Sequence, residues 1–305
     1  MDYIYILLGL AGLIFGGEAL VRGSVNLTRR MGISPLIIGL TVVGFGTSTP
    51  ELLVSVQAAL RGVPDIAIGN IVGSNIANIL LIVGLTALVW PIRVAGASYG
   101  RDAAVMIAAA LLLLPLFALG SINRLAGLLL MAGLAIYLVQ TLKNPGEMAT
   151  DDDSPVAVTP VWISVLWVAA GLAAVMFGAQ FLVDGATSVA RILGVSEAFI
   201  GLTIVAVGTS LPELATSLVA AFRRQSEIAI GNILGSNVFN VLGVLGVTAF
   251  IAPIPVAPRF LTFDLPIMIL ASFVLAGLLH LRPQIGRGIG ALMLLGYMVY
   301  VFLAQ

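Results

Sequence analysis

The sequence predicts an all-α polytopic membrane protein with ten transmembrane helices, arranged as two five-helix repeats of inverted topology. Three observations lead to this fold class. Hydrophobic residues make up 60% of the 305 residues and charged residues only 9%, whereas soluble domains carry roughly 25% charged residues. Ten apolar stretches approach the length of a membrane span, and a long segment of the first half of the chain recurs in the second half.

Each expected helix is an apolar stretch of about the length that the bilayer requires. Crossing the hydrocarbon core takes about 20 apolar residues. The stretches are 3–22, 35–60, 67–90, 102–119, 123–142, 160–183, 197–222, 229–252, 262–281 and 286–304. Residues 3–22 follow no basic segment and precede no clear small-residue cleavage site. We therefore expect them to form the first span rather than a cleaved signal peptide.

One polar segment, residues 143–159, separates the two halves of the chain. It contains four acidic residues and two prolines, and it lies between long apolar stretches. This composition predicts a solvated acidic linker rather than a helix. The chain then divides into a first half (1–142) and a second half (160–305).

The distribution of basic residues predicts the orientation. The set of alternate loops that includes the linker holds ten Lys and Arg residues, and the other set holds four. Basic residues concentrate in cytoplasmic loops. We therefore expect the linker to be cytoplasmic and both termini to be extracellular, in a multi-pass protein of the cell (plasma) membrane.

Two motifs recur in the same register. Residues 39–52 read GLTVVGFGTSTPEL and residues 201–214 read GLTIVAVGTSLPEL, while residues 69–78 read GNIVGSNIAN and residues 231–240 read GNILGSNVFN. The offset is 162 throughout, and 24 of the 40 positions from 39 to 78 are identical to their counterparts. We name residues 39–85 repeat 1 and residues 201–247 repeat 2. Because each half holds an odd number of spans, the repeats must cross the membrane in opposite directions, which is an arrangement typical of secondary transporters.

Glu51 and Glu213 are the carboxylates expected near the middle of the membrane. A charge at that depth costs at least about 2.5–3.5 kcal/mol on insertion scales, so it indicates a functional site. A protonated glutamate in an interhelical hydrogen bond is the alternative for a single residue. Two glutamates at matching positions in two repeats favour function.

Other oxygen donors gather around each glutamate. Thr47 and Ser48 lie one helical turn before Glu51, and Thr209 and Ser210 repeat this spacing before Glu213. Pro50 and Pro212 directly precede the glutamates and, inside a helix, would free backbone carbonyls of the preceding turn. Polar stripes continue in the second motif, at Asn70, Ser74, Asn78 and at Asn232, Ser236, Asn240. Interhelical hydrogen bonding explains some of these amides, and Asn75 and Asn237 are expected to have only that role.

The donor set consists of hard oxygen ligands, which suit Ca²⁺ and Na⁺. Two carboxylates would balance the charge of one Ca²⁺ or of two Na⁺. Competition of these ions for one charge-balanced pocket is the physical basis of an antiporter.

At these motifs the sequence resembles the cation/calcium exchanger superfamily, in particular the short prokaryotic sodium/calcium exchangers. The resemblance covers both repeats and implies cation sites formed by the second, third, seventh and eighth helices, with alternating access of the site to the two sides. The implied cation ligands are Glu51, Glu213, Thr47, Ser48, Thr209, Ser210, Ser74, Asn78, Ser236, Asn240 and the backbone carbonyls of Gly44 and Ala206. Some sodium/calcium exchangers carry Asp where this sequence has Asn240, and the missing carboxylate weighs against proton coupling.

The remaining composition limits the alternatives. The chain has no Cys, one His and a net charge of zero, which leaves no thiolate or His-rich metal site and no electrostatic case for nucleic acid. Sequence motifs of intramembrane or metal-dependent enzymes are missing, so we expect a transporter and not an enzyme. We expect it to need no cofactor and to act as a monomer in the bilayer. A Ca²⁺/H⁺ exchanger, a K⁺-dependent Ca²⁺/Na⁺ exchanger and, less favoured, a passive cation channel stay open as alternatives.

Three further groups of charged residues are expected to lie outside the ion site. Glu18 precedes Arg22 by four residues and should form a helix-surface pair with it. Asp184 and Asp264 fall near helix ends, where we expect them to be solvated. His280 also lies at a helix end and is not expected to be a ligand.

Overall fold

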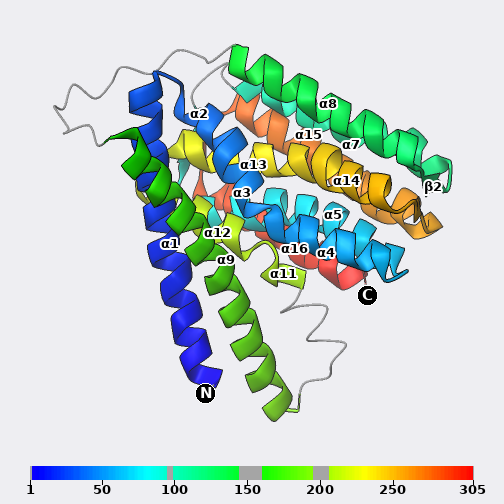
Figure 1. The fold of residues 1–305 in the computed structure, drawn as a ribbon, viewed down its shortest axis with the longest axis horizontal. Coiled ribbons are helices and arrows are strands. Elements are labelled where there is room, and N and C mark those ends of the chain that lie inside the picture. The colour runs from blue at the N-terminus through cyan, green and yellow to red at the C-terminus, as the bar shows by residue number, and fades with distance from the viewer. Residues whose placement is uncertain (1, 95–98, 144–159, 195–205, 305) are drawn as a thin grey trace. The chain divides into compact units, whose positions relative to one another are not determined.

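The computed structural model describes residues 2–94, 99–143, 160–194 and 206–304 (Figure 1). These residues form helices joined by short turns and four two-residue strands, which confirms the all-α expectation. Most of the linker at 143–159 and residues 197–205 of the seventh expected span lie outside the described residues.

Seven helical stretches of the described residues are long and apolar enough to cross a membrane. They are α1 (Asp2–Met31), α5 to α6 through the π-helical turn η2 (Pro64–Val89), α7 (Gly100–Ala118), α8 (Arg124–Lys143), α9 (Val161–Ile192), α13 to α14 through η5 (Ser226–Ile251), and η6 with α15 (Phe260–Leu281). A bent pair, α2 to α3 through η1 (Pro35–Thr47) followed by α4 (Thr49–Leu60), makes an eighth span if it counts as one.

Two apolar helices are shorter, α12 (Leu211–Phe222) and α16 (Arg287–Leu303). They fall in the seventh and tenth expected stretches, and the short segment α11 (Ala206–Gly208) precedes α12. Each of the ten stretches therefore contains a helix in the described part of the chain. The protein is a polytopic membrane protein, as the composition predicts.

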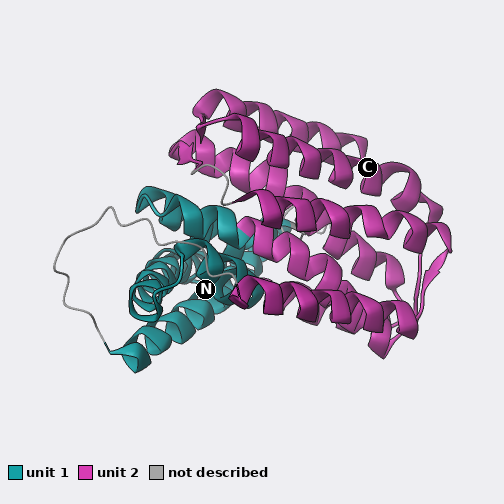
Figure 2. Cartoon of the chain, turned by 90° about the horizontal axis from the view of Figure 1, so that it is seen from above, with its two compact units in different colours: residues 1–47, 145–232 teal, residues 48–144, 233–305 magenta. Residues whose placement is uncertain are grey.

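The helices form two compact units, coloured separately in Figure 2. Unit 1 comprises Met1–Thr47 and Pro145–Asn232, and unit 2 comprises Ser48–Asn144 and Ile233–Gln305. Each unit takes residues from both halves of the sequence. The units therefore do not coincide with the two halves that the linker separates, because helices of one half pack against helices of the other.

In unit 1, α1 packs along its repeat counterpart α9 through regularly spaced glycines (Figure 1). A Cβ atom on Gly9 would lie 2.6 Å from the backbone nitrogen of Leu182, and one on Gly171 would lie 2.5 Å from that of Leu20. Contacts that advance along α1 retreat along α9, so the two helices are antiparallel. Small residues permit this close backbone approach, which is a common basis of helix association in membranes.

In unit 2, two glycine contacts each join one half of the chain to the other. The helix α6 (Val83–Val89) meets α16 where a Cβ on Gly290 would lie 2.6 Å from the carbonyl oxygen of Gly84. The helix α14 (Leu245–Ile251) meets α8 where a Cβ on Gly127 would lie 2.6 Å from the carbonyl oxygen of Gly246. The helices α6 and α14 are repeat counterparts, and so are α8 and α16, so the two contacts correspond helix by helix.

Two antiparallel strand pairs follow the same rule in unit 2. The strand β1 (Ile92–Arg93) pairs with β4 (Gln284–Ile285), and β2 (Ser121–Ile122) pairs with β3 (Ile254–Pro255). Each pair again joins the first half to the second. The pairing therefore follows the internal repeat, even though the units themselves cut across it.

Candidate cation-binding residues

The first glutamate motif lies at a helix break. The helix α3 (Gly44–Thr47) ends before Ser48, which has φ −83° and ψ 9°, and α4 starts at Thr49 with Pro50 and Glu51 in its first turn. The sequence predicted a proline inside a continuous helix, and that expectation was wrong. Pro50 instead takes a first-turn position, where its missing N–H leaves no hydrogen bond unmade.

The second motif repeats this geometry within unit 1. Ser210 has φ −91° and ψ 5°, and α12 starts at Leu211 with Pro212 and Glu213 in its first turn. The carboxylate is therefore carried at the N-terminus of a 12-residue helix in both repeats. The partial positive charge of a helix N-terminus stabilises an ionised carboxylate, which is the form that binds a cation.

Both glutamates are buried, with 1% of Glu51 and none of Glu213 exposed. Their positions in buried first turns agree with a functional role and not with a chance polar residue on a lipid-facing surface. A carboxylate this far from solvent needs charge compensation.

An asparagine anchors each glutamate-bearing turn. In unit 2, Asn70 Nδ2 donates to the backbone oxygen of Glu51 at 3.1 Å and to Ser55 Oγ at 2.9 Å. In unit 1, Asn232 Nδ2 donates to the backbone oxygen of Glu213 at 3.2 Å and to Ser217 Oγ at 3.0 Å. The two sets are repeat counterparts. Sequence reasoning placed both asparagines in a polar stripe without assigning this role.

The helix before the break also presents oxygens. Thr47 is fully buried, and its Oγ1 lies 3.1 Å from the backbone oxygen of Val43, 3.3 Å from that of Gly44 and 3.1 Å from Asn232 Oδ1. Its single proton can serve only one of these three acceptors. Three oxygens therefore gather around this hydroxyl at the end of α3.

The predicted site residues divide evenly between the two units. Unit 1 contains Gly44, Thr47, Ala206, Thr209, Ser210 and Glu213, and unit 2 contains Ser48, Glu51, Ser74, Asn78, Ser236 and Asn240. Ser48, Ser74, Ser210 and Ser236 are buried, and Thr209 is half-buried. Ala206 begins α11. Each unit thus carries one glutamate together with hydroxyl, carbonyl or amide oxygens.

Two buried amides have atoms without hydrogen-bond partners among the described residues. Neither amide atom of Asn78 has such a partner, and Asn240 lacks one at Oδ1. The two residues are 1% and 0% exposed. Buried polar atoms in proteins are nearly always paired. The amide oxygens of Asn78 and Asn240 are therefore suited to contact a bound cation or a water molecule.

The described residues contain no group of three or more His, Cys, Asp or Glu side chains that could hold a metal ion. A cation held by this part of the chain would therefore rest on few carboxylates and many neutral oxygens. Such ligand sets are typical of Ca²⁺ and Na⁺ and unlike those of Zn²⁺.

The structure corrects one expectation about the other carboxylates. Asp264 is not solvated but 3% exposed, accepts a hydrogen bond from Tyr300 Oη at 2.9 Å, and lies 3.4 Å from Arg259 Nε. It is buried because the end of its helix faces the neighbouring α16. Asp184 is exposed as expected, and His280, at the end of α15, is also exposed.

Sequence reasoning missed the repeat counterpart of Asp264. Asp102 is 1% exposed, accepts a hydrogen bond from Tyr137 Oη at 3.1 Å, and pairs with Arg101 at 3.1 Å. The signal was present, because Asp102 and Asp264 are separated by the same 162 residues as the two glutamates. Both aspartates already have Tyr and Arg partners, so they belong to helix packing rather than to the cation site.

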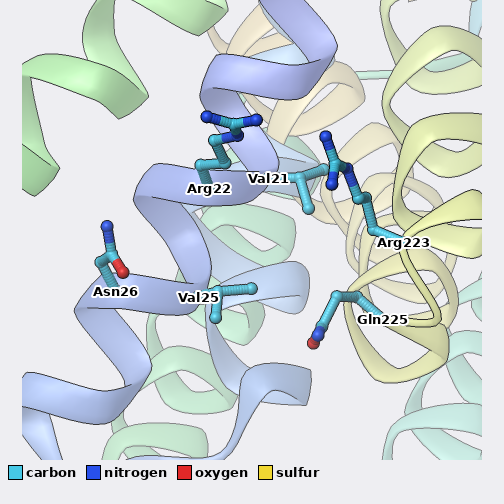
Figure 3. Close-up of a pocket in the computed structure, with 6 residues that line it drawn as sticks. All are labelled: Val21, Arg22, Val25, Asn26, Arg223 and Gln225. Carbon is cyan, nitrogen blue, oxygen red and sulfur yellow. The ribbon is translucent and has the colours of Figure 1, made fainter. Parts of the chain in front are cut away.

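A cavity of about 250 Å³ in unit 1 contains none of the predicted ligands. Figure 3 shows its lining residues, which are Val21, Arg22, Val25, Asn26, Arg223 and Gln225. The expected pairing of Arg22 with Glu18 is confirmed, and Arg223 Nε also donates to Glu18 Oε2 at 2.9 Å. Two guanidinium groups make this cavity unsuitable for a cation.

Comparison with known proteins gives a consistent result over the whole chain. Residues 1–143 and 163–304 match the family described as sodium/calcium exchanger protein. The chain is 40% identical over 312 residues to CaxA of Alkalimonas amylolytica, covering 98% of this chain and 97% of that protein. It is 30% identical over 342 residues to the sodium/calcium exchanger MaX1 of Methanosarcina acetivorans, covering 99% and 97%.

A solved structure shares the fold as well as the sequence. The sodium-calcium exchanger NCX_Mj, soaked with Na⁺ and Ca²⁺, superposes with a TM-score of 0.86 at 34% identity, covering 100% of this chain and 98% of that chain. The chain is a polytopic membrane protein, and the family it matches is one of membrane exchangers. The chain belongs to the sodium/calcium exchanger family and is a cation/calcium exchanger of the prokaryotic type.

Proposed function

We propose that the protein exchanges cytosolic Ca²⁺ for external Na⁺ across the cell (plasma) membrane by alternating access. Ten spans in two inverted repeats form the transporter, both termini are extracellular, and the monomer is the functional form. Glu51 and Glu213 bind the transported cations, together with the hydroxyl, carbonyl and amide oxygens of the two repeats that the sequence analysis named.

The observation that carries this proposal is the repetition of one local geometry. In each repeat a buried glutamate lies in the first turn of a helix after a break, and an asparagine holds its backbone oxygen. Structural repetition of a buried carboxylate is expensive in a membrane unless a cation compensates its charge. Ca²⁺ and Na⁺ are the cations for which the surrounding neutral oxygens are suited.

Sodium coupling is favoured by Asn240. An amide cannot take up a proton at neutral pH, so this position offers less capacity for H⁺ than a carboxylate would. The relative MaX1 is named a sodium/calcium exchanger, which agrees with this assignment. Exchange for H⁺, or a further requirement for K⁺, is the principal alternative, and a passive channel is a weaker one.

Alternating access is supported by the internal repeat. Two copies of one helical unit that cross a membrane in opposite directions can exchange their conformations, which opens one site to each side in turn. The antiparallel contact of the repeat counterparts α1 and α9 agrees with that inversion.

Calcium uptake into proteoliposomes tests the coupling ion. Purified protein is reconstituted, and uptake of Ca²⁺ is measured under an imposed Na⁺ gradient, an H⁺ gradient, or a Na⁺ gradient with and without K⁺. We expect the Na⁺ gradient alone to drive uptake. Uptake that follows the pH gradient and does not depend on Na⁺ would overturn the ion assignment. Uptake down the Ca²⁺ gradient alone, with no Na⁺ or H⁺ gradient imposed, would indicate a channel.

The glutamates give the matching test of the site. We expect Glu51→Gln and Glu213→Gln each to abolish Na⁺-driven Ca²⁺ uptake, because the neutral amide removes one of the two charges that offset the cation. The control is Asp184→Asn, which neutralises an exposed carboxylate and should leave uptake unchanged. Normal exchange by both glutamine variants would contradict the proposed site.

A further inference from the structure

Three asparagines of unit 2 form a chain of side-chain amides. Asn75, in α5 (Pro64–Ile76), donates through Nδ2 to the backbone oxygen of Asn237 at 3.4 Å and to Met268 Sδ at 3.6 Å. Asn240, at the start of η5 (Asn240–Val244), donates through Nδ2 to Asn75 Oδ1 at 3.2 Å. Asn75, Asn237 and Asn240 are 2%, 1% and 0% exposed.

A backbone carbonyl sets the direction of this chain. The oxygen of Asn237 can only accept hydrogen bonds, and so can a thioether sulfur. The amide nitrogen of Asn75 must therefore face Asn237 and Met268, which points its oxygen at Asn240. Asn240 must then donate its Nδ2 to this oxygen, and its own Oδ1 is directed away from Asn75.

The remaining atom of Asn240 is an oxygen with no hydrogen-bond partner among the described residues. An amide that could rotate freely would present its NH₂ group to a cation as readily as its oxygen. The NH₂ group carries partial positive charge and offers no lone pair to a metal ion. Fixing the Asn240 amide in one orientation removes the conformers that would point the NH₂ group at the cation.

We propose that Asn75 is a positioning residue that holds the Asn240 amide with its oxygen available to the transported cation. This inference rests on the proposed function, since it assigns Asn75 a task in the same cation binding. It also revises the expectation that Asn75 serves packing alone, because its hydrogen bonds determine which atom of Asn240 is exposed to the ion.

The same arrangement is missing in the other repeat. Asn237 is the counterpart of Asn75, but its Nδ2 donates to the backbone oxygen of Ile233 in its own helix at 2.9 Å. Asn78 is the counterpart of Asn240, and neither of its amide atoms has a partner among the described residues. The rotamer is therefore fixed in one repeat only, and Asn237 is a natural control for Asn75.

The test compares Ca²⁺ affinity in four variants of the purified full-length protein. Equilibrium binding of Ca²⁺ is measured without Na⁺, and thermal unfolding without ions reports on folding. We expect Asn75→Leu to weaken Ca²⁺ binding by about tenfold, from the cost of one lost charge-to-dipole contact, and Asn237→Leu to change it by less than about twofold, because Asn237 makes only a local bond. Asn240→Leu should match or exceed the effect of Asn75→Leu.

One further comparison separates positioning from simple stability. In the Asn240→Leu background, adding Asn75→Leu should cause no further loss of affinity, because the residue through which Asn75 acts is gone. A role in stability alone would give additive effects.

The outcomes distinguish this inference from the proposed function. A wild-type protein that binds no Ca²⁺ contradicts the proposed function and, with it, the role of Asn75. A wild type that binds Ca²⁺, with Asn75→Leu unchanged or with additive losses in the Asn75→Leu and Asn240→Leu double variant, overturns only the positioning role. If Asn75→Leu does not fold, Asn75→Ala, which also removes the acceptor for Asn240 Nδ2, takes its place in each comparison.

Discussion

At the scale of single residues, the most informative feature is that each glutamate is held through its backbone. Asn70 and Asn232 bind the main-chain oxygens of Glu51 and Glu213 and leave the carboxylates for other contacts. Each asparagine lies on the helix that follows and joins it to the first turn of the glutamate-bearing helix. The same residue type thus provides both a structural anchor and, at Asn78 and Asn240, candidate ligands.

We expect Asn70→Leu to lower the thermal stability of the protein and to reduce Ca²⁺ uptake. The substitution removes the hydrogen bonds from Asn70 Nδ2 to the backbone oxygen of Glu51 and to the buried hydroxyl of Ser55, at a cost of about 1–3 kcal/mol. Melting in detergent and proteoliposome uptake measure the two effects. Asn232→Leu should behave in the same way.

Gln57→Leu is the control for this prediction. Gln57 lies on α4 like Glu51, but it is exposed. The change from polar to apolar is the same, so stability and uptake should stay close to wild type. Equal losses in Asn70→Leu and Gln57→Leu would mean that a change from polar to apolar, and not loss of the anchor, causes the effect.

At the scale of helices, the sequence predicts the number and place of the apolar stretches well and their internal breaks poorly. Hydropathy is read from the local sequence alone, so it can place the apolar stretches without knowledge of their neighbours. Each expected stretch contains a helix in the described residues. A proline in an apolar run reads the same whether it kinks a helix or begins a new one. The break at Ser48 and the burial of Asp264 depend on neighbouring helices, which a single stretch of sequence does not specify.

The glycines of α1 and α9 were also beyond sequence reasoning in detail. Their abundance predicts close packing somewhere, but the partner of each glycine follows only from the antiparallel contact. Seven-residue spacing places Gly9, Gly16 and Gly23 on one face of α1, and Gly171, Gly178 and Gly185 repeat the spacing in α9. Both helices therefore depend on a smooth shared surface.

We expect Gly171→Ala to destabilise unit 1. The added Cβ would lie 2.5 Å from the backbone nitrogen of Leu20, and neither backbone can yield without separating the helices. Overpacking of this kind costs typically about 1–3 kcal/mol. The effect should appear as a lower melting temperature in detergent and as loss of transport.

Gly277→Ala is the control, and we expect it not to lower the stability of the protein. Gly277 lies inside α15 with nothing within 4 Å of an added Cβ among the described residues. Alanine favours a helix over glycine by roughly 0.5–1 kcal/mol, so stability should stay the same or rise. A melting temperature lowered equally by both substitutions would contradict the packing explanation.

At the scale of the whole molecule, the internal repeat explains more of the structure than the linker does. The linker suggests two halves, yet every glycine contact and strand pair described above joins one half to the other. Neither half could bury its apolar surfaces alone in the same way. The repeat therefore describes how the helices are connected and arranged, and its two copies are not separately folding domains.

The proposed inverted topology predicts on which side of the membrane each residue of a repeat-related pair lies. Residues separated by the repeat offset must lie on opposite sides of the membrane, whatever the conformation of the transporter. Two such pairs are exposed, Met31 with Leu193 and Leu119 with Leu281, at 58%, 76%, 75% and 76%. Because the chain has no cysteine, a single Cys at each position can be labelled without background.

We expect Leu119→Cys and Leu193→Cys to react with a membrane-impermeant maleimide in intact cells, and Met31→Cys and Leu281→Cys to react only after the membrane is permeabilised. The expected sides follow from the excess of basic residues in the loops assigned to the cytoplasm. Labelling of all four in the reverse sense would keep the inversion but reverse the orientation. Labelling of both members of a pair from one side would contradict inverted topology itself, and with it the symmetry on which alternating access depends.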